Sequence, residues 1–415
     1  MEFPTTTILE GDCRKTLYDL PAESVHMVAT SPPYWGLRNY GGDDDEIGTE
    51  SLHDCLGWTN GDECGKCFVC HIVQVGRAAW HCLRKDGIFF LNLGDSFVSA
   101  SSERQPLDAE HRTGQVCNAS KNANPGEGRA RRNEAARRGG LKPKDMAMIP
   151  ARCLLALQSD GWYGRMDNIW KKDNVMPGSQ TDRPTRQHEY IWMLTKSEHY
   201  YYDEIAIQEP CVNGDGSPPR GSKGVRGSVN SGLWKQDNTG FNDRYQPRQM
   251  RTKRSIWHCN TIPSREGHFA MWPPKLARTM VKCGTSAKGC CPHCGAGWKR
   301  VVEKTAGKST SCPKEIASHE ARGGHGSHTG TVGKSGGGRI DGCTQTTGWE
   351  PSCKCPHTED ELVRATVLDC FSGSGTTGRV AIEEGRSYIG CELNPDYVKM
   401  GERRIKNAQP ALALD

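Results

Sequence analysis

The sequence predicts an α/β fold whose core is a doubly wound, mostly parallel sheet. Short apolar runs alternate along the chain with segments of helical spacing, which is the pattern of strands joined by helices. Residues 365–408 carry the order strand, glycine turn, helix, strand, helix, the local form of a doubly wound sheet. The 415 residues allow two or three domains and a core that needs no disulfides.

Each element follows from a local pattern. Apolar runs at residues 24–30, 87–93 and 188–196 predict strands, and the first leads directly into Ser-Pro-Pro-Tyr. Residues 148–161 have helical spacing and end at a glycine. Near the carboxyl end, strands at 365–370 and 387–393 alternate with helices at 377–385 and 395–408. Residues 99–140 and 304–348 are polar and glycine-rich or arginine-rich, which predicts loops or partly disordered segments.

Composition narrows the classes of protein. Mean hydropathy is −0.69 and no apolar run is long enough to span a membrane, so we expect no integral membrane protein. The first residues lack a basic leader and a long apolar run, so we expect no export and a cytoplasmic location in a bacterium, an archaeon or a phage-infected cell. The formal net charge is +5, but basic residues concentrate at 129–144 and 211–265. Such segments fit a polyanionic partner or solvated loops.

A glycine turn near the carboxyl end predicts a nucleotide-type cofactor. Gly373, Gly375 and Gly378 form GxGxxG between a strand and a helix, and Glu392 follows 17 residues after Gly375, where a carboxylate grips ribose hydroxyls. Asp369 stands four residues before the first glycine, where it would repel a pyrophosphate but attract an ammonium group. S-adenosylmethionine has that ammonium, a carboxylate for the helix amino end and a ribose. A glycine turn without a ligand is the alternative.

The segment Ser31-Pro32-Pro33-Tyr34 is the sharper signal. It ends an apolar strand, where side chains reach the crevice at the carboxyl edge of a parallel sheet. The Ser31 hydroxyl and the Pro32 carbonyl can accept the two N–H bonds of an exocyclic amino group, and Tyr34 can stack on a planar base. Two prolines fix the backbone that aims the carbonyl. An isolated motif of this kind would more simply be a proline turn.

Together these motifs resemble the amino-methyltransferases of DNA, which methylate cytosine N4 or adenine N6. Blocks that match the family include EGDCRKTLYDLP, SPPYWGLRNYG, LNLGDSF, HEYIWMLTK, HFAMWPPKLA and VLDCFSGSGTTG. The base-binding motif precedes the cofactor turn, which resembles the permuted β group of that family. The resemblance implies a Rossmann-like, S-adenosylmethionine-dependent fold with circularly permuted motif order, a target-recognition insert and double-stranded DNA as partner, with a restriction endonuclease as a candidate partner. It leaves the oligomeric state open.

The resemblance also implies boundaries and site residues. We expect a catalytic half at 1–208, a target-recognition segment at 209–265, a cofactor-packing segment at 266–289, a zinc-ribbon-like insert at 290–357 and a cofactor-binding half at 358–415. The expected cofactor contacts are Asp12, Asp369, Phe371, Gly373, Gly375, Thr376, Thr377, Glu392 and Asn394. The expected DNA contacts are Trp35, stacking on a flipped base, and Arg248, Arg251, Lys253 and Arg254.

The expected reaction is direct methyl transfer to an exocyclic nitrogen of a base flipped out of the duplex. Family members acting on adenine usually carry Asp at the position of Ser31, and those acting on cytosine N4 usually carry Ser, so we favour cytosine N4. Adenine N6, a non-catalytic zinc-containing nucleic-acid binder and methylation of RNA or protein amides are the alternatives. Carbon-5 methylation is disfavoured because the one Pro-Cys pair, Pro210-Cys211, lies far from the glycine turn.

Two cysteine clusters predict metal. Cys291 and Cys294, followed by Cys353 and Cys355, resemble the two knuckles of a zinc ribbon, and four thiolates suit structural Zn²⁺. A second, weaker candidate comprises Cys55, Cys64, Cys67 and Cys70. Because its three-residue period also suits the start of a helix, buried free thiols are the alternative there.

Overall fold

The central element is one eight-stranded sheet. The computed structural model describes residues 4–35, 47–48, 50, 63–98, 141–178, 180–210, 250–261, 272–304 and 344–408. The strands lie in the order β1-β12-β11-β2-β3-β5-β4-β8. Their bounds are β1 (Thr6–Glu10), β12 (Ser387–Glu392), β11 (Thr366–Asp369), β2 (Val25–Thr30), β3 (Leu83–Leu93), β5 (His188–Thr195), β4 (Tyr163–Lys171) and β8 (Ile256–His258).

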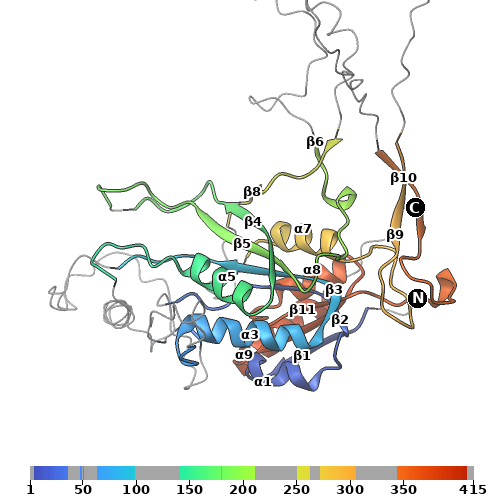
Figure 1. Ribbon diagram of the computed structural model, residues 1–415, viewed down its shortest axis with the longest axis horizontal. Helices are drawn as coiled ribbons and strands as arrows, with labels where there is room; N and C mark the ends of the chain where they lie inside the picture. Colours follow the sequence, from blue (N-terminus) through green and yellow to red (C-terminus); the bar gives the residue numbers. More distant parts are fainter. Residues whose placement is uncertain are drawn as a thin grey trace, which may run out of the picture. The chain divides into compact units, whose positions relative to one another are not determined.

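The strands from β1 to β3 are all parallel, whereas β5 runs antiparallel to both β3 and β4. The chain leaves the β11–β2 pair in opposite directions, toward β12 on one side and β3 on the other. Figure 1 shows β11, β2 and β3 close together in the central sheet. In a doubly wound sheet, ligands bind outside the carboxyl ends of the strands at this switch point. The predicted doubly wound, mostly parallel sheet is confirmed.

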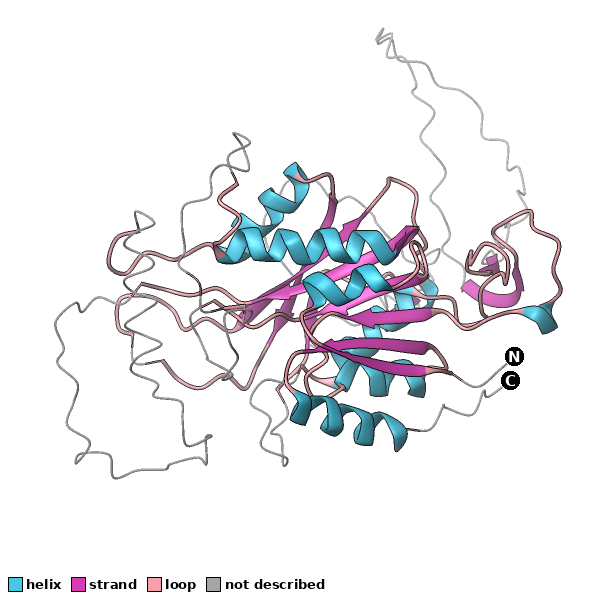
Figure 2. Cartoon of the chain, turned by 90° about the horizontal axis from the view of Figure 1, so that it is seen from below, coloured by secondary structure: helices cyan, strands magenta, loops and turns pink. Residues whose placement is uncertain are grey.

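Helices cover both faces of the sheet (Figure 2). Val28 of β2 packs into one buried cluster, with α1 (Cys13–Thr16), η1 (Leu17–Asp19), α3 (Phe68–Cys82) and α5 (Ile149–Ser159). Its neighbours Met27 and Ala29 belong to a second cluster, with α7 (Pro274–Gly284), α8 (Thr376–Glu383) and Ile405 of α9 (Pro395–Lys406). Successive strand residues point to opposite faces, so a fully buried strand has apolar residues throughout.

The chain divides into two compact units. The sheet lies in a unit formed by residues 1–207, 254–299 and 349–415, and the other unit comprises 208–253 and 300–348. Two small sheets pair β6 (Glu209–Pro210) with β7 (Met250–Arg251), and β9 (Lys299–Lys304) with β10 (Thr344–Glu350). Two short 3-10 turns are η3 (Ile205–Ile207) and η4 (Glu359–Glu361). Among the described residues, no helix is long and apolar enough to cross a membrane.

The elements predicted from the sequence are confirmed within a few residues, and β3 begins four residues earlier than expected. The elements that the sequence patterns did not single out include β1, α3, β4, β8 and α7, and β10 extends into the expected loop 304–348. The expected loop 99–140 and most of the recognition segment lie outside the described residues.

Candidate active site

The two motifs singled out in the sequence meet at the carboxyl edge of the sheet. Ser31–Tyr34 follow β2 and the glycine turn follows β11, and these strands are parallel neighbours. The hydroxyl of Thr30, the last residue of β2, donates a hydrogen bond of 2.6 Å to Asp369 Oδ1 at the end of β11. The predicted juxtaposition of the proline motif and the glycine turn is therefore present.

Asp369 braces this junction from inside. Its side chain is 3 % exposed and accepts three hydrogen bonds, from Thr30 Oγ1, from Thr377 Oγ1 at 2.6 Å and from the amide N–H of Phe371 at 3.1 Å. Burial raises the pKa of Asp369, while the two threonine hydroxyls and the amide act in the opposite direction. The contact of this carboxylate with a ligand ammonium stays a prediction; within the protein, its three hydrogen bonds connect β2, β11 and α8.

The glycines of the turn serve packing and conformation. Gly373 and Gly375 have φ of +50° and +75°, the left-handed region that side chains disfavour. A Cβ on Gly375 would lie 2.9 Å from the Cα of Gly401 in α9, and one on Gly378 would lie 2.5 Å from both Ile405 and Tyr388. The turn is therefore shaped by the close approach of α9 and β12.

Glu392 lies at the end of β12, on the same carboxyl edge of the sheet. Its carboxylate accepts hydrogen bonds from the amides of Gly373 at 2.8 Å and Asn394 at 2.9 Å. Burial raises the pKa of Glu392, and these amides oppose the rise. Each oxygen keeps a second lone pair, which suits a ribose hydroxyl. The buried hydroxyl of Thr376, the first residue of α8, has no hydrogen-bond partner among the described residues. A polar group of a ligand at this helix amino end would satisfy it, so the turn fits S-adenosylmethionine.

The other expected cofactor residues Asp12, Asn394 and Phe371 each have contacts within the protein, and their cofactor contacts stay predictions. Asp12 caps α1 by accepting from the amide of Arg14 and pairs with the Arg14 guanidinium at 2.9 Å. Asn394 caps α9 by accepting from the amide of Asp396. Phe371 packs, partly buried, against the core cluster that contains Val28. These three residues support the shape of the site.

A polar network stands behind the proline motif. The Tyr34 hydroxyl donates to Glu189 Oε2 at 2.5 Å, and Lys172 pairs with the other oxygen of Glu189. Asn92 Nδ2 lies 2.6 Å from Tyr34 Oη, 3.2 Å from Ser31 Oγ and 3.1 Å from Glu189 Oε2. A Cβ at Gly94 would lie 2.6 Å from the Tyr34 ring, so the ring lies directly against this glycine. Ser31 and Tyr34 are thus held by residues of β3 and β5.

The acceptor-only carboxylate of Glu189 fixes which way the Asn92 amide points. An amide oxygen placed next to Glu189 Oε2 would meet another acceptor, so the NH₂ group must face it. The Asn92 Oδ1 atom is left buried and without a hydrogen-bond partner among the described residues, and the residue is 1 % exposed. A buried, unpaired carbonyl next to Ser31 is available to a further donor.

Comparisons with known proteins agree with this geometry. A family model described as "DNA methylase", covering N6 and N4 methylases, matches residues 25–309 and 358–403. The Type II methyltransferase M.Cfr9I of Citrobacter freundii is 30% identical over 406 residues, which span 98% of this chain and 89% of that protein. M.SmaI of Serratia marcescens, also a Type II methyltransferase, is 29% identical over 96% of this chain and 90% of its own length.

The chain belongs to the N6/N4 DNA methylase family.

Among solved structures, the cytosine-N4-specific PvuII DNA methyltransferase resembles this DNA methylase with a TM-score of 0.46 at 14% identity, covering 97% of this chain and 89% of that one. That likeness is too weak to support any conclusion about the base.

Trp35 has a different place from the one predicted. It is 2 % exposed, belongs to the core cluster that contains Val28, and donates its indole N–H to the carbonyl oxygen of Glu50 at 2.9 Å. Its ring is covered by protein, so the expected stacking of Trp35 on a flipped base is not supported in this DNA methylase.

The predicted DNA-contacting cations are only partly described. Arg251 and Lys253 both pair with Glu209, at 2.9 Å and 3.8 Å, so one acid offsets two bases. Arg254 is exposed, and Arg248 lies outside the described residues. These three described residues remain candidates for phosphate contacts.

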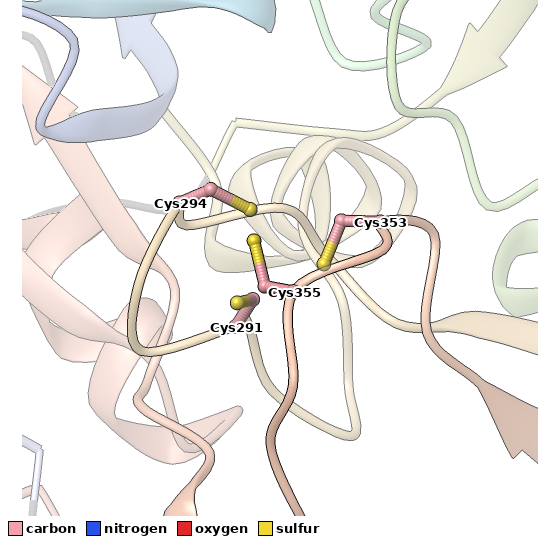
Figure 3. Close-up of side chains that lie close together, drawn as sticks. All are labelled: Cys291, Cys294, Cys353 and Cys355. Carbon is pink, nitrogen blue, oxygen red and sulfur yellow. The ribbon is translucent and has the colours of Figure 1, made fainter.

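The first predicted cysteine cluster is assembled in the DNA methylase. The sulfur atoms of Cys291, Cys294, Cys353 and Cys355 all lie within 4.8 Å of one another (Figure 3). In the second cluster, the sulfurs of Cys64, Cys67 and Cys70 also lie within 4.8 Å of one another. Cys55 lies outside the described residues. Cys67 also caps α3 by accepting from the amide of Cys70, as the helix-start alternative predicted.

Sequence reasoning missed Asn92, Glu189 and Lys172. Asn92 and Glu189 lie in strands recognised by their apolar residues, whereas Lys172 follows β4, which no sequence pattern indicated. A polar residue inside a buried apolar run was the available signal, because such a residue requires a partner.

Proposed function

We propose that this chain transfers a methyl group from S-adenosylmethionine to the N4 amino group of cytosine in double-stranded DNA, with the base flipped out of the duplex. The supporting observation is the hydrogen bond from Thr30 to Asp369, which places the proline motif and the cofactor turn side by side. A flipped base and a cofactor seated on these two motifs would share one crevice.

Each part of the crevice has a task in this proposal. When bound, S-adenosylmethionine supplies an electrophilic methyl group on its sulfonium. Ser31 Oγ and the Pro32 carbonyl accept the two amino protons, which directs the nitrogen lone pair away from them. Tyr34 stacks on the base and is held from behind by Glu189 and Asn92. As the N–C bond forms, the S–C bond of the sulfonium would break with its electron pair left on sulfur as a thioether, and one amino proton would leave to water. The rate then comes from positioning and preset dipoles rather than from a covalent intermediate.

Cytosine N4 is favoured over adenine N6 by the neutral hydroxyl of Ser31. Adenine N6 is the second candidate because the structure brings a carboxylate, Glu189, to the same network. That carboxylate already accepts from Tyr34 and Asn92 and is paired with Lys172, so it is a weaker acceptor for an incoming amino group. The Type II name of the relatives supports sequence-specific methylation of duplex DNA, with a restriction endonuclease as a candidate partner.

The identity of the methylated base is tested by expressing the chain in a host that lacks DNA amino-methylation. The nucleosides of the host DNA are then measured by mass spectrometry. We expect N4-methylcytosine to appear and to be absent with the Ser31→Ala variant. N6-methyladenine in place of N4-methylcytosine would overturn the choice of base. Neither product, together with no S-adenosylmethionine binding by calorimetry, would favour the non-catalytic binder.

The proposal also includes a structural zinc ion and a recognition segment at 209–265. The four cysteines of Figure 3 are the candidate ligands of the ion. The described part of the recognition segment that carries Arg251 and Lys253 would contact DNA phosphates.

A further inference from the structure

The four cysteines of Figure 3 take no part in the proposed methyl transfer. They come from two segments, Cys291 and Cys294 in one and Cys353 and Cys355 in the other, and all four are free thiols. Their sulfurs lie within 4.8 Å of one another. With zinc–sulfur bonds of about 2.3 Å, tetrahedral coordination separates sulfurs by about 3.8 Å, a separation that this limit allows.

The first segment has the backbone form of a metal knuckle. The amide of Gly295 donates to the carbonyl of Cys291 at 2.8 Å, and the amide of Cys291 donates to the carbonyl of Ala296 at 2.9 Å. Gly295 has φ of +72°, which allows the tight turn directly after Cys294.

Contacts outside the cluster bring the second segment to the first. Cys290 and Val363 exchange two backbone hydrogen bonds, of 2.9 Å and 3.0 Å. The indole of Trp298 donates to His357 Nε2 at 2.9 Å, and Ser352 Oγ donates to the Gly297 carbonyl at 2.6 Å. The four thiols are therefore brought together by the fold.

The knuckle is attached to the amino ends of three catalytic strands. His26, on β2, accepts at Nδ1 from the amide of Thr366, the first residue of β11, at 2.9 Å. Its other nitrogen must therefore carry the proton and donate to the Gly295 carbonyl, 3.0 Å away. Arg84, near the start of β3, donates to the Cys294 carbonyl and pairs with Asp86.

We propose that Cys291, Cys294, Cys353 and Cys355 bind one Zn²⁺ and that His26 and Arg84 link the ion to the amino ends of β2, β3 and β11. The ion is structural, because four protein thiolates leave no open coordination position. It holds the three strands whose carboxyl ends form the candidate active site, from the opposite end. The inference rests on the zinc ion of the proposed function and adds its link to the sheet, and its tests are independent of methyl transfer because they need neither DNA nor S-adenosylmethionine.

The first test measures metal content. We expect zinc in the purified full-length chain by plasma mass spectrometry, with one ion lost in the Cys353→Ser/Cys355→Ser variant and none lost in the control variant Cys259→Ser, at a free cysteine outside both clusters. Because the first variant could fail to fold, the wild type is also stripped and refilled with Co²⁺, whose absorption spectrum reports tetrahedral thiolate ligation. A wild type without zinc that also shows no thiolate–Co²⁺ bands, or zinc retained by the folded Cys353→Ser/Cys355→Ser variant, would overturn the site.

The second test measures the link to the sheet. Removing zinc with a chelator should speed amide hydrogen exchange in residues 25–30 and 366–369. His26→Ala should speed zinc transfer to the chelator about fivefold, the effect of one hydrogen bond. His199→Ala, at an exposed histidine, is the control and should change neither rate. Unchanged exchange on zinc removal, or His26→Ala indistinguishable from the control, would overturn the link.

Discussion

The two ends of the parallel strands differ in how completely their polar groups are paired. At the amino ends, both ring nitrogens of His26 are hydrogen-bonded, and burial lowers its pKa to about 4, which keeps the imidazole neutral. At the carboxyl ends, Asn92 Oδ1 and Thr376 Oγ1 are buried without partners among the described residues. The paired imidazole of His26 stabilises the fold at one end, whereas the unpaired Asn92 and Thr376 oxygens at the other end are available to a ligand.

The largest expected effect comes from removing the aromatic ring at the unpaired end. Tyr34→Ala should lower kcat at least about 100-fold, because stacking and positioning are both lost, and should leave S-adenosylmethionine affinity nearly unchanged. Single-turnover kinetics and calorimetry measure the two quantities. Tyr34→Phe keeps the ring, so its kcat should fall less. A large loss of cofactor affinity in Tyr34→Ala would contradict the stacking role.

A smaller loss of kcat is expected when Asn92, which contacts both Ser31 and Tyr34, is substituted. Asn92→Ala should lower kcat about tenfold to 100-fold with little change in cofactor affinity, because the seat loses its alignment. A double-mutant cycle with Glu189→Gln should show effects that do not add, since both residues contact the Tyr34 hydroxyl. Strict additivity in kcat would show that the two residues act separately.

The next largest effect is expected from substitution of Asp369, which accepts the hydrogen bonds between the two motifs. Asp369→Ala leaves the Thr30 and Thr377 hydroxyls and the Phe371 amide without their acceptor and should weaken S-adenosylmethionine binding about tenfold or more. Asp369→Asn keeps one acceptor oxygen, so its S-adenosylmethionine affinity should fall clearly less. Calorimetric titration measures both variants. Equal losses would indicate that the charge itself contacts the cofactor, as we first expected.

The smallest effect is expected at Trp35. Trp35→Phe removes the hydrogen bond to Glu50 but retains most of the buried ring, so we expect about 1 kcal/mol lower unfolding free energy and kcat within about twofold of wild type. Denaturant unfolding and steady-state kinetics test this. A strong loss of kcat at unchanged stability would restore the base-stacking role.

The sequence predicted the site residues at the carboxyl ends of the parallel strands better than the residues that strand pairing brings together. Ser31, Asp369 and Glu392 each follow an apolar run, and parallel strands bring such positions to one edge. Asn92 and Glu189 meet because β5 runs antiparallel beside β3, with Asn92 opposite Ile191. No local pattern encodes that register. Trp35 was misplaced because adjacency to Tyr34 in sequence does not tell which way the next side chain points.

The cysteine spacings predicted four neighbouring thiols but not their attachment. His26 lies within a strand whose other residues are buried and apolar, apart from Thr30 at its end. Only the pairing of β2 with β11 shows that its nitrogens serve a neighbouring strand on one side and the knuckle on the other.

Gly375 and Gly401 touch back to back, one in the cofactor turn and the other in α9. Arg404, a turn further along α9, donates to the carbonyl of Ser374 at 2.6 Å. Helix α9 therefore packs directly against the glycine turn and supports its conformation. Deleting α9 would remove this support from the turn, and Gly375 can gain a side chain only if α9 first moves away.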